Sequence, residues 1–319
     1  MSGCYDDSPD PIDCWCRKSQ SWPDQVSFDC TVSRSRLCRP TLNQIEFGVS
    51  MISKLSSLMA LPLLVVLSLP AAAEHSVFLE ELTSPEVRVA IQAGKTTAII
   101  PTGGVEQNGP HMVLGKHNFI VTFAAGEIAR RLGTALVAPV LPYVPEGEVD
   151  PPTGHMRYAG TITLPPEHFA AVVEFVARSL KAHGFLDIVL LGDSGKNQAP
   201  LDHVAQKLNK EWADTNVRVH YLGDYYDYQN GTFLEWLREQ GESEEDIGRH
   251  AGITDTSQLL AIHPEGIRVD RLAPGRAGDG TGVVGNPAKA STEYGRRGLE
   301  LKIEAAIRQL RVLVRTSRE

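Results

Sequence analysis

The sequence predicts an α/β protein with a mostly parallel sheet, and two observations support this prediction. From residue 74 onward, short apolar runs alternate with longer amphipathic stretches, at a spacing that is typical of strands joined by helices. One of these runs, DIVLLGD at 187–193, is apolar almost without interruption, as expected of a strand that is covered on both faces. We therefore expect residues 74–319 to form one α/β domain.

The predicted elements follow one another along this domain. The first strand is expected at 96–101, and an amphipathic helix is expected over 118–133, where Gly133 ends it. The other predicted elements are, in chain order, a strand in 135–144, a helix over 165–184 with proline in its first turn, a strand over 187–193, a helix over 198–213, a strand over 217–228 and a long amphipathic helix over 291–314.

The composition is that of an ordinary globular protein. Of the 319 residues, 42% are hydrophobic, which is enough for a sizeable core, and the formal net charge is -8. The acidic excess is scattered, and the chain contains no basic stripe. The charge pattern therefore predicts neither a nucleic-acid partner nor a membrane-surface partner.

A secretory signal peptide is predicted at 51–73. Met51 could start it, Lys54 supplies its positive charge, and an apolar core too short to span a bilayer precedes three alanines. Cleavage near Ala73 would leave a mature chain that begins at Glu74. We therefore expect a protein exported to the periplasm or secreted, without a stable membrane anchor.

The first 50 residues do not fit this scheme. They have little apolar periodicity, and all five cysteines of the chain precede Met51. We interpret residues 1–50 as a spurious or disordered extension, added by an upstream start codon chosen in error. The alternative is a zinc module, but the cysteine spacing does not match the paired ligands of such sites. A mature chain without cysteine suits an oxidising compartment, because it has no thiol to mispair.

Two polar, glycine-rich segments follow predicted strands. GGVEQNGPHMVLGKHN, at 103–118, comes after the strand at 96–101, and GDSGKNQ, at 192–198, comes after the strand at 187–193. Because ligands of open parallel sheets bind beyond the carboxyl ends of the strands, both segments are expected to face one crevice.

Glu106, His111 and His117 in the first segment have side chains suited to a metal ion. Carboxylate oxygen and imidazole nitrogen are both good donors to an ion such as zinc, and a loop can bring them together. In the alternative interpretation, these side chains only satisfy backbone groups of a glycine-rich turn.

Three other motifs have weaker functional interpretations. GDSGKN is similar to a serine-nucleophile segment, but Lys196 replaces the second glycine of a nucleophile elbow, which favours a positioned polar turn. GTGVVG, at 280–285, lacks the preceding strand of a dinucleotide-binding motif, so we interpret it as a loop. Asp255 could be a plain helix cap, while His250 could project into the crevice as a general base or ligand.

The order of these segments resembles the creatininase (creatinine amidohydrolase) family. PTGGVEQNGPHMVLGKHN, GTITL, AHGFLDIVLLGDSGKNQ and RHAGITDTSQLLAIHPEGI occur in the order found in that family, and the similarity covers most of residues 80–310. The resemblance implies a three-layer α/β/α fold, frequently assembled as a hexamer. It also implies a metal-activated water that opens a cyclic or linear amide.

The resemblance carries over to the metal ligands only in part. Glu106 matches an acidic ligand of the family, whereas Asn108 stands where a histidine ligand is usual and His117 where a bridging aspartate is usual. Ser194 and Lys196 stand where the family has a histidine and a glutamate ligand. His250 matches a histidine near the substrate, and Asp255 matches an acidic residue at the following helix start.

These replacements favour one divalent ion over two. A bridging carboxylate offsets the charge of two cations, which an imidazole does less well, and Lys196 adds positive charge. We expect a single zinc or manganese ion held by Glu106 and His117, with Asp193 or His250 as a further ligand. Creatinine is therefore not the expected substrate.

The leading functional hypothesis is a metal-dependent hydrolase that cleaves a C–N bond in a small-molecule amide. His250 or Asp255 would carry the proton to the leaving nitrogen, and the chain would form a homo-oligomer, a hexamer by resemblance. The alternative is a relative without catalysis that binds a small polar ligand. The residues expected to bind the substrate are Asn108, His111, Ser194 and Asn197.

Overall fold

The computed structural model of the chain describes residues 76–228 and 231–316. The predicted extension at 1–50, the predicted signal peptide at 51–73 and its cleavage near Ala73 lie outside these residues and stay predictions. Within the described ranges, no helix is both long and apolar enough to span a membrane.

The sheet has four parallel strands in the order β2-β1-β3-β4. Its central strands, β1 (Thr97–Thr102) and β3 (Asp187–Gly192), pair along their whole length, and every residue of both is buried. β2 (Ala135–Val137) and β4 (Arg218–Tyr221) form the two edges. The predicted α/β class with a parallel sheet is confirmed.

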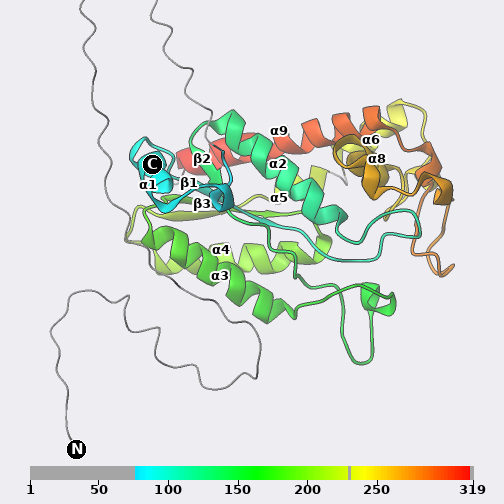
Figure 1. The fold of residues 1–319 in the computed structure, drawn as a ribbon, viewed down its shortest axis with the longest axis horizontal. Helices are drawn as coiled ribbons and strands as arrows, with labels where there is room; N and C mark the ends of the chain where they lie inside the picture. Colours follow the sequence, from blue (N-terminus) through cyan, green and yellow to red (C-terminus); the bar gives the residue numbers. More distant parts are fainter. Residues whose placement is uncertain (1–75, 229–230, 317–319) are drawn as a thin grey trace, which may run out of the picture. The chain divides into compact units, whose positions relative to one another are not determined.

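Helices cover both faces of the sheet, so the fold has three layers (Figure 1). α3 (Pro166–Ala182) and α4 (Gln198–Glu211) lie on one face, and α2 (Lys116–Leu132) and α9 (Thr292–Thr316) lie on the other. The predicted α/β/α architecture is therefore confirmed. The other α-helices of the described residues are α1 (Ser84–Gln92), α5 (Gly223–Asp227), α6 (Thr232–Glu239), α7 (Glu244–Ile247) and α8 (Ile253–Ile262).

The alternation of side chains along β1 divides the core into two clusters. Ala98 and Ile100 pack in one cluster with Phe169 of α3, while Ile99 packs in the other with Val121 of α2. All of these side chains are buried, and each large apolar one contributes about 1.5–3 kcal/mol by leaving water. The two clusters therefore fix the sheet, and with it the carboxyl ends of the strands.

The strand predicted in 135–144 is shorter than expected. β2 ends at Val137, and the chain beyond it contains Pro139 and Pro142. Proline has no N–H to donate to a neighbouring strand, so the apolar run continues without regular pairing.

The strand predicted over 217–228 is wrong in its second half. β4 ends at Tyr221, and α5 follows at once. Tyr225 and Tyr228 are both buried, and their spacing of three residues suits one face of a helix better than the alternating faces of a strand.

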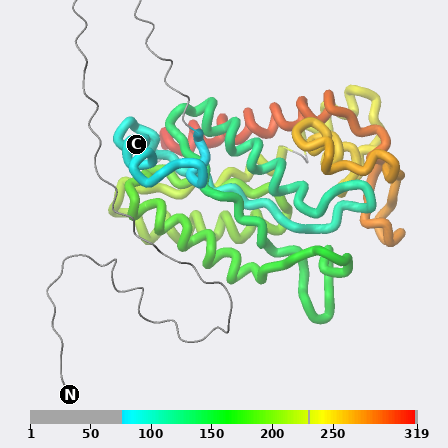
Figure 2. Tube along the Cα trace, viewed as in Figure 1, coloured from blue at the N-terminus to red at the C-terminus, as the bar shows by residue number. Residues whose placement is uncertain are grey.

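Loops from distant parts of the sequence meet at the carboxyl ends of the strands. Figure 2 shows the loop at 103–115 and the segment at 263–290, in orange, at the same end of the described chain. Met112 of the first forms a bridge with Ile267 of the second. The crevice expected beyond the strands is therefore built from loops of both halves of the sequence.

Candidate active site

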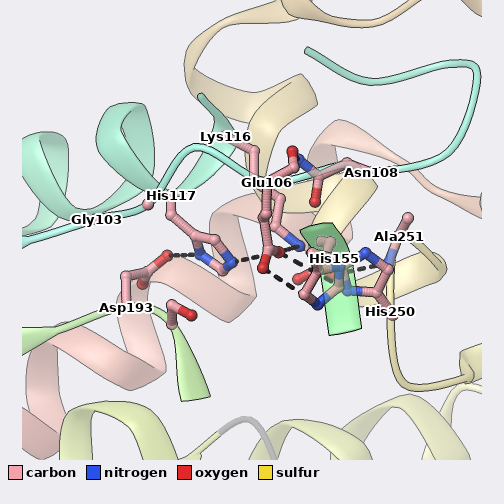
Figure 3. Close-up of polar contacts among 12 residues, drawn as sticks. Gly103, Glu106, Asn108, Lys116, His117, His155, Asp193, His250 and Ala251 are labelled. Carbon is pink, nitrogen blue, oxygen red and sulfur yellow. Dashed lines mark hydrogen bonds and ion pairs between the residues drawn. The ribbon is translucent and has the colours of Figure 1, made fainter. Parts of the chain in front are cut away.

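The loop after β1 and the first turn of α2 bring three charged side chains together. Glu106 N–H donates to Leu114 O at 3.1 Å, so the loop folds back, and α2 then begins with Lys116 and His117. At the start of this loop, a β-carbon on Gly103 would lie 2.1 Å from an Asn118 side-chain oxygen, which only glycine avoids. The side chains of Glu106, Lys116 and His117 consequently converge (Figure 3).

His117 is held between two carboxylates (Figure 3). Its Nε2 lies 2.9 Å from Glu106 Oε1, and its Nδ1 lies 2.7 Å from Asp193 Oδ2. Burial and the ammonium of Lys116 oppose a charge on the ring, but the two carboxylates outweigh them and raise the pKa of His117 to about 9. At neutral pH the ring is therefore an imidazolium, and both of its nitrogens donate.

Asp193 acts on the site through His117. Its other oxygen, Oδ1, accepts hydrogen bonds from Lys302 Nζ at 2.6 Å and from the Tyr225 hydroxyl at 2.7 Å. Burial alone would raise the pKa of Asp193, but Lys302 and His117 hold that pKa well below its usual range. Asp193 is therefore an ionised carboxylate whose two oxygens both have donors.

Lys116 also lies between two carboxylates. Its Nζ donates to Asp255 Oδ2 at 2.7 Å and lies 3.4 Å from Glu106 Oε1. Asp255, in the first turn of α8, accepts a second hydrogen bond from Ala251 N–H at 2.8 Å. Although burial opposes both charges, the attraction between them raises the pKa of Lys116 and lowers that of Asp255 to about 2. Both groups are therefore charged at neutral pH.

A pocket of about 320 Å³ is lined by four of these charged groups, Glu106, Lys116, His117 and Asp255. A larger groove of about 770 Å³ runs between α3 and α4 and touches this pocket at Gly195 and Lys196, but it lacks the clustered acids and imidazoles. We therefore place the chemistry in the smaller pocket. Besides Glu106, Lys116, His117 and Asp255, its lining includes Glu146, His155, Ser194, Lys196, Arg249 and His250.

Glu106, His155 and His250 form a group that could hold a metal ion. One potential ligand atom from each side chain lies within 4.8 Å of the other two. His155 Nε2 is 3.4 Å from Glu106 Oε2, and His250 Nδ1 is 3.8 Å from Glu106 Oε1 (Figure 3). Two imidazoles and one carboxylate are a known ligand set of catalytic zinc sites.

Gln107 orients both of these imidazoles. The backbone carbonyl of Gln107 accepts a hydrogen bond from His250 Nε2 at 2.9 Å, and the Gln107 side-chain nitrogen lies 3.2 Å from His155 Nδ1. Each ring therefore uses one nitrogen on Gln107 and turns the other toward Glu106. Metal-binding histidines are commonly fixed in this way by a partner of the distal nitrogen.

Both imidazoles are neutral at physiological pH. Burial, assisted by Lys116, lowers the pKa of His250 to about 4, and burial also lowers the pKa of His155. A neutral imidazole is the form that binds a metal ion. His155 and His250 therefore differ from His117, which carries a proton on each nitrogen.

Glu146 is a buried carboxyl group that faces the same pocket. Its side-chain oxygens have no hydrogen-bond donor among the residues that the structure describes, and 1% of the residue is exposed. Burial and then the negative charge of Glu106 raise the pKa of Glu146 to about 9. Glu146 is therefore protonated at neutral pH.

The structure brings some of the residues predicted from the sequence into the pocket. Glu106, His117, Ser194, His250 and Asp255 all line it. Of the predicted metal ligands, Asp193 lies behind His117, and both nitrogens of His117 contact carboxylates instead of facing open space.

Three residues predicted to bind substrate lie behind the pocket. Asn108 donates to the carbonyls of Glu106 and Val113 and so stabilises its own loop. His111 is buried and lies 3.1 Å from the Thr256 hydroxyl of α8. Asn197 donates to the carbonyl groups at the end of β1. In this structure, all three hold the loops that form the pocket.

Several pocket residues were not singled out from the sequence. His155 lies in the long Pro- and Gly-rich loop that the sequence indicated as functional, but a single histidine in a loop gives no spacing pattern. Lys116 directly precedes His117 in GKHN, at the start of α2. A lysine at a helix start is usually exposed to solvent, so its sequence position gave no sign that it is buried in the site. Glu146 and Arg249 also lack a local signal, since only the folded chain brings them into the pocket.

The fold and the pocket together define a class of protein. A parallel α/β sheet carries, beyond its carboxyl edge, an acid and two neutral imidazoles in a small polar pocket, as expected of a metal-dependent hydrolase.

Comparisons with known proteins give the family. The family model for creatininase, creatinine amidohydrolase, matches residues 80–310. The creatinine amidohydrolase of Pseudomonas putida is 28% identical over 201 residues, which cover 62% of this chain and 76% of that protein. The mycofactocin precursor peptide peptidase of Mycobacterium ulcerans (strain Agy99) is 28% identical over 234 residues, which cover 62% of this chain and 78% of that protein.

The solved structures agree with this result. A structure described as "Creatininase Mn" superimposes with a TM-score of 0.62 at 26% identity, covering 75% of this chain and 99% of that one. The chain therefore belongs to the creatininase family of amidohydrolases, as the resemblance predicted.

Proposed function

We propose that this protein is a metal-dependent hydrolase that cleaves a C–N amide bond with the help of one divalent ion. The observation that carries this proposal is the convergence of Glu106, His155 and His250, whose potential ligand atoms lie within 4.8 Å of one another. The solved creatininase named with Mn supports a metal ion in this family. Zinc fits the two imidazoles and one carboxylate best, and manganese is the second candidate.

The chemistry of the donors favours this group over one built on His117 and Asp193. His155 and His250 each point a nitrogen at Glu106, whereas both nitrogens of His117 already contact carboxylates. A cation at His117 would have to displace a proton that Glu106 and Asp193 hold there. We therefore assign His117 to the support of Glu106, and the ion to Glu106, His155 and His250.

The surroundings of Glu106 favour one ion over two. Two divalent ions lie about 3.5–4 Å apart in sites that bind both, and they need several carboxylates between and around them. Here the ammonium of Lys116 lies 3.4 Å from Glu106 Oε1, and the His117 ring also contacts that oxygen. Both positive groups stand where a second ion would need negative charge.

The remaining pocket residues would bind the substrate and move protons. When bound, the ion would lower the pKa of a water molecule and so supply the nucleophile. Asp255 and Glu146 are the pocket carboxyl groups outside the ligand set, and we assign proton transfer to and from the substrate to them. Ser194, which also lines the pocket, would orient the amide.

The test is elemental analysis of the protein, purified without chelator, beside its Glu106→Ala, His155→Ala and His250→Ala variants. We expect about one zinc or manganese ion per chain in the wild type and its loss in all three variants. His117→Gln, which keeps a polar group of similar reach, should retain the ion. His168→Ala, at an exposed histidine of α3, is the matched control and should also retain it.

Activity should follow the ion. A panel of cyclic and linear amides, assayed by release of the amine, should give turnover with the wild type and none with the variants that lose the ion. Creatinine should not be turned over. A wild-type protein without metal would contradict the mechanism and favour the alternative, a family member that binds a small polar ligand without catalysis.

A further inference from the structure

Two cations in the pocket form no side-chain hydrogen bond or ion pair within the described chain. Lys196 and Arg249 both line the pocket and are exposed to solvent, and neither side chain makes a hydrogen bond or an ion pair with any residue of 76–228 or 231–316. By the family resemblance, Lys196 also stands where an acidic ligand is usual. Its charge is therefore opposite to the one that a metal site needs.

Each of these cations is close to the backbone that carries one of the two neutral imidazoles. A β-carbon on Gly154, the residue before His155, would lie 3.0 Å from Lys196 Nζ. Arg249 directly precedes His250, and its backbone N–H donates to Val284 O at 2.8 Å, which fixes its position at the pocket edge. Both cations therefore line the same pocket as Glu106, His155 and His250.

The other charges of the site are already matched. Lys116 pairs with Asp255, His117 with Glu106, and Lys302 with Asp193. Within the pocket lining, these pairs leave a single further carboxyl group, that of Glu146, to oppose Lys196 and Arg249. Outside the lining, Arg249 also attracts the carboxylate of Glu244.

The pocket therefore has an excess of positive charge even with Glu146 ionised, and a divalent ion would add to it. The whole chain, in contrast, has a formal net charge of -8. A local positive excess in a small pocket of an acidic protein attracts an anionic ligand.

We propose that the amide substrate carries a carboxylate, which Lys196 and Arg249 bind beside the scissile C–N bond. The inference rests on the proposed function for the identity of the bond, but not for the binding of the carboxylate. Arg249 can bind a carboxylate through two parallel hydrogen bonds, and Lys196 adds a point charge. The pocket of about 320 Å³ suits a small amide, such as an acylated amino acid or dipeptide, better than a large one.

The experiment compares two probes that differ by one charge, N-acetylglycylglycine and its terminal carboxamide. Their dissociation constants are measured by calorimetry, with protein purified without chelator and with protein treated with chelator. We expect the acid to bind the wild type at least about tenfold more tightly than the carboxamide, because each charge-assisted hydrogen bond contributes about that factor or more. The preference should fall to below about threefold in Lys196→Met and in Arg249→Met.

Control variants separate local binding from general electrostatics. Arg308→Met removes one exposed positive charge on α9, outside the pocket lining, and should keep the full preference for the acid. Lys196→Arg, which keeps the charge, should retain most of it. Because Lys196 and Arg249 are exposed, unfolding temperatures of their variants should match the wild type.

The outcomes distinguish the two proposals. A preference for the acid in wild-type protein that contains no metal even when purified without chelator would contradict the hydrolase and leave the carboxylate site standing. Equal binding of the two probes, no binding of either, or the same loss in Arg308→Met would overturn the carboxylate site. If inorganic phosphate displaces the acid at a concentration where acetate does not, the bound group is a phosphate and the carboxylate assignment is wrong.

Discussion

Lys302 Nζ lies 2.6 Å from Asp193 Oδ1, and neither side chain is exposed by more than 1%. The pair joins α9 to the end of β3, and the ammonium also lies 4.4 Å from the centre of the Tyr225 ring. Removing one partner of such a buried pair leaves the other charge without compensation. Lys302 therefore supports both the fold and, through Asp193, the ionised state of His117.

Lys302→Met should destabilise the protein strongly. We expect the free energy of unfolding, measured in urea, to fall by about 3–5 kcal/mol, because Asp193 then remains buried with less positive charge around it. Lys207→Met is the matched control: Lys207 pairs with Glu174 at 2.7 Å but is 49% exposed, so its loss should cost less than about 1 kcal/mol. Equal effects of the two substitutions would contradict this role of Lys302.

A second prediction concerns the close approach of α8 and α9. A β-carbon on Gly295 of α9 would lie 1.8 Å from Ser257 O of α8. In an open helix, glycine to alanine would gain about 1 kcal/mol from helix propensity, but here the added methyl forces two backbones apart. Gly295→Ala should therefore lower the free energy of unfolding by more than about 2 kcal/mol, by the cost of overpacking.

Gly133→Ala separates this clash from a general cost of losing glycine. Gly133 ends α2 at φ 73° and a β-carbon there meets no atom within 4 Å, so alanine should cost only about 1 kcal/mol, from the left-handed backbone. The same unfolding measurement serves both variants. A Gly295→Ala protein at least as stable as Gly133→Ala would show that α8 and α9 can move apart freely.

Much of the fold follows from patterns that act over a few residues. The buried strands β1 and β3 and the amphipathic helices α2, α3 and α9 all lie close to their predicted ranges, because burial on one or two faces leaves a periodic signal. The rule that ligands bind beyond the carboxyl ends of parallel strands also placed Glu106 and Ser194 correctly in one pocket. The tyrosine-rich helix α5 was wrongly predicted as a strand, because its aromatic residues favour strands by propensity. Only tertiary packing makes this segment helical.

The site was harder to predict because its partners are far apart in sequence. Lys302 meets Asp193 across 109 positions, and Lys116 meets Asp255 across 139. A single sequence gives no signal for such pairs. His155 needs the fold of its own long loop to reach Glu106, whereas Asn108 and Asn197 look like ligand-binding residues but satisfy backbone carbonyls. Residue type therefore indicated the location of the site better than the role of each residue.

A third prediction is a loss of stability at alkaline pH. Burial raises the pKa of both Tyr221 and Tyr226 to about 12, above the value of about 10 for a tyrosine in an unfolded chain. The folded state thus holds protons that the unfolded state releases. The stability from these two groups is fully present below about pH 10 and is lost as the pH rises through about 12.

Thermal unfolding at pH values from about 9 to 12, with tyrosinate absorbance followed in parallel, measures this loss. The Tyr221→Phe, Tyr226→Phe double variant should lose less stability over that interval than the wild type, since phenylalanine cannot ionise. Deprotonation of lysine side chains affects both proteins alike, so the difference between their curves isolates the tyrosines. Superimposable curves would contradict the prediction.

The last prediction contrasts two neighbouring buried tyrosines. The Tyr225 hydroxyl donates to Asp193 at 2.7 Å, whereas the buried Tyr228 hydroxyl has no hydrogen-bond partner within the part of the chain that the structure describes. Removing a hydroxyl that donates to a carboxylate costs about 1.5–3 kcal/mol, while removing one that is buried without a partner relieves an uncompensated loss of hydration. We therefore expect Tyr225→Phe to lower the free energy of unfolding by about 2 kcal/mol and Tyr228→Phe to leave it unchanged or raise it by about 1 kcal/mol.

Urea unfolding of the two variants measures both values, and because each substitution deletes one oxygen from the same residue type, any difference reports the hydrogen bond. A Tyr228→Phe variant destabilised as much as Tyr225→Phe would mean that the Tyr228 hydroxyl has a partner in solution.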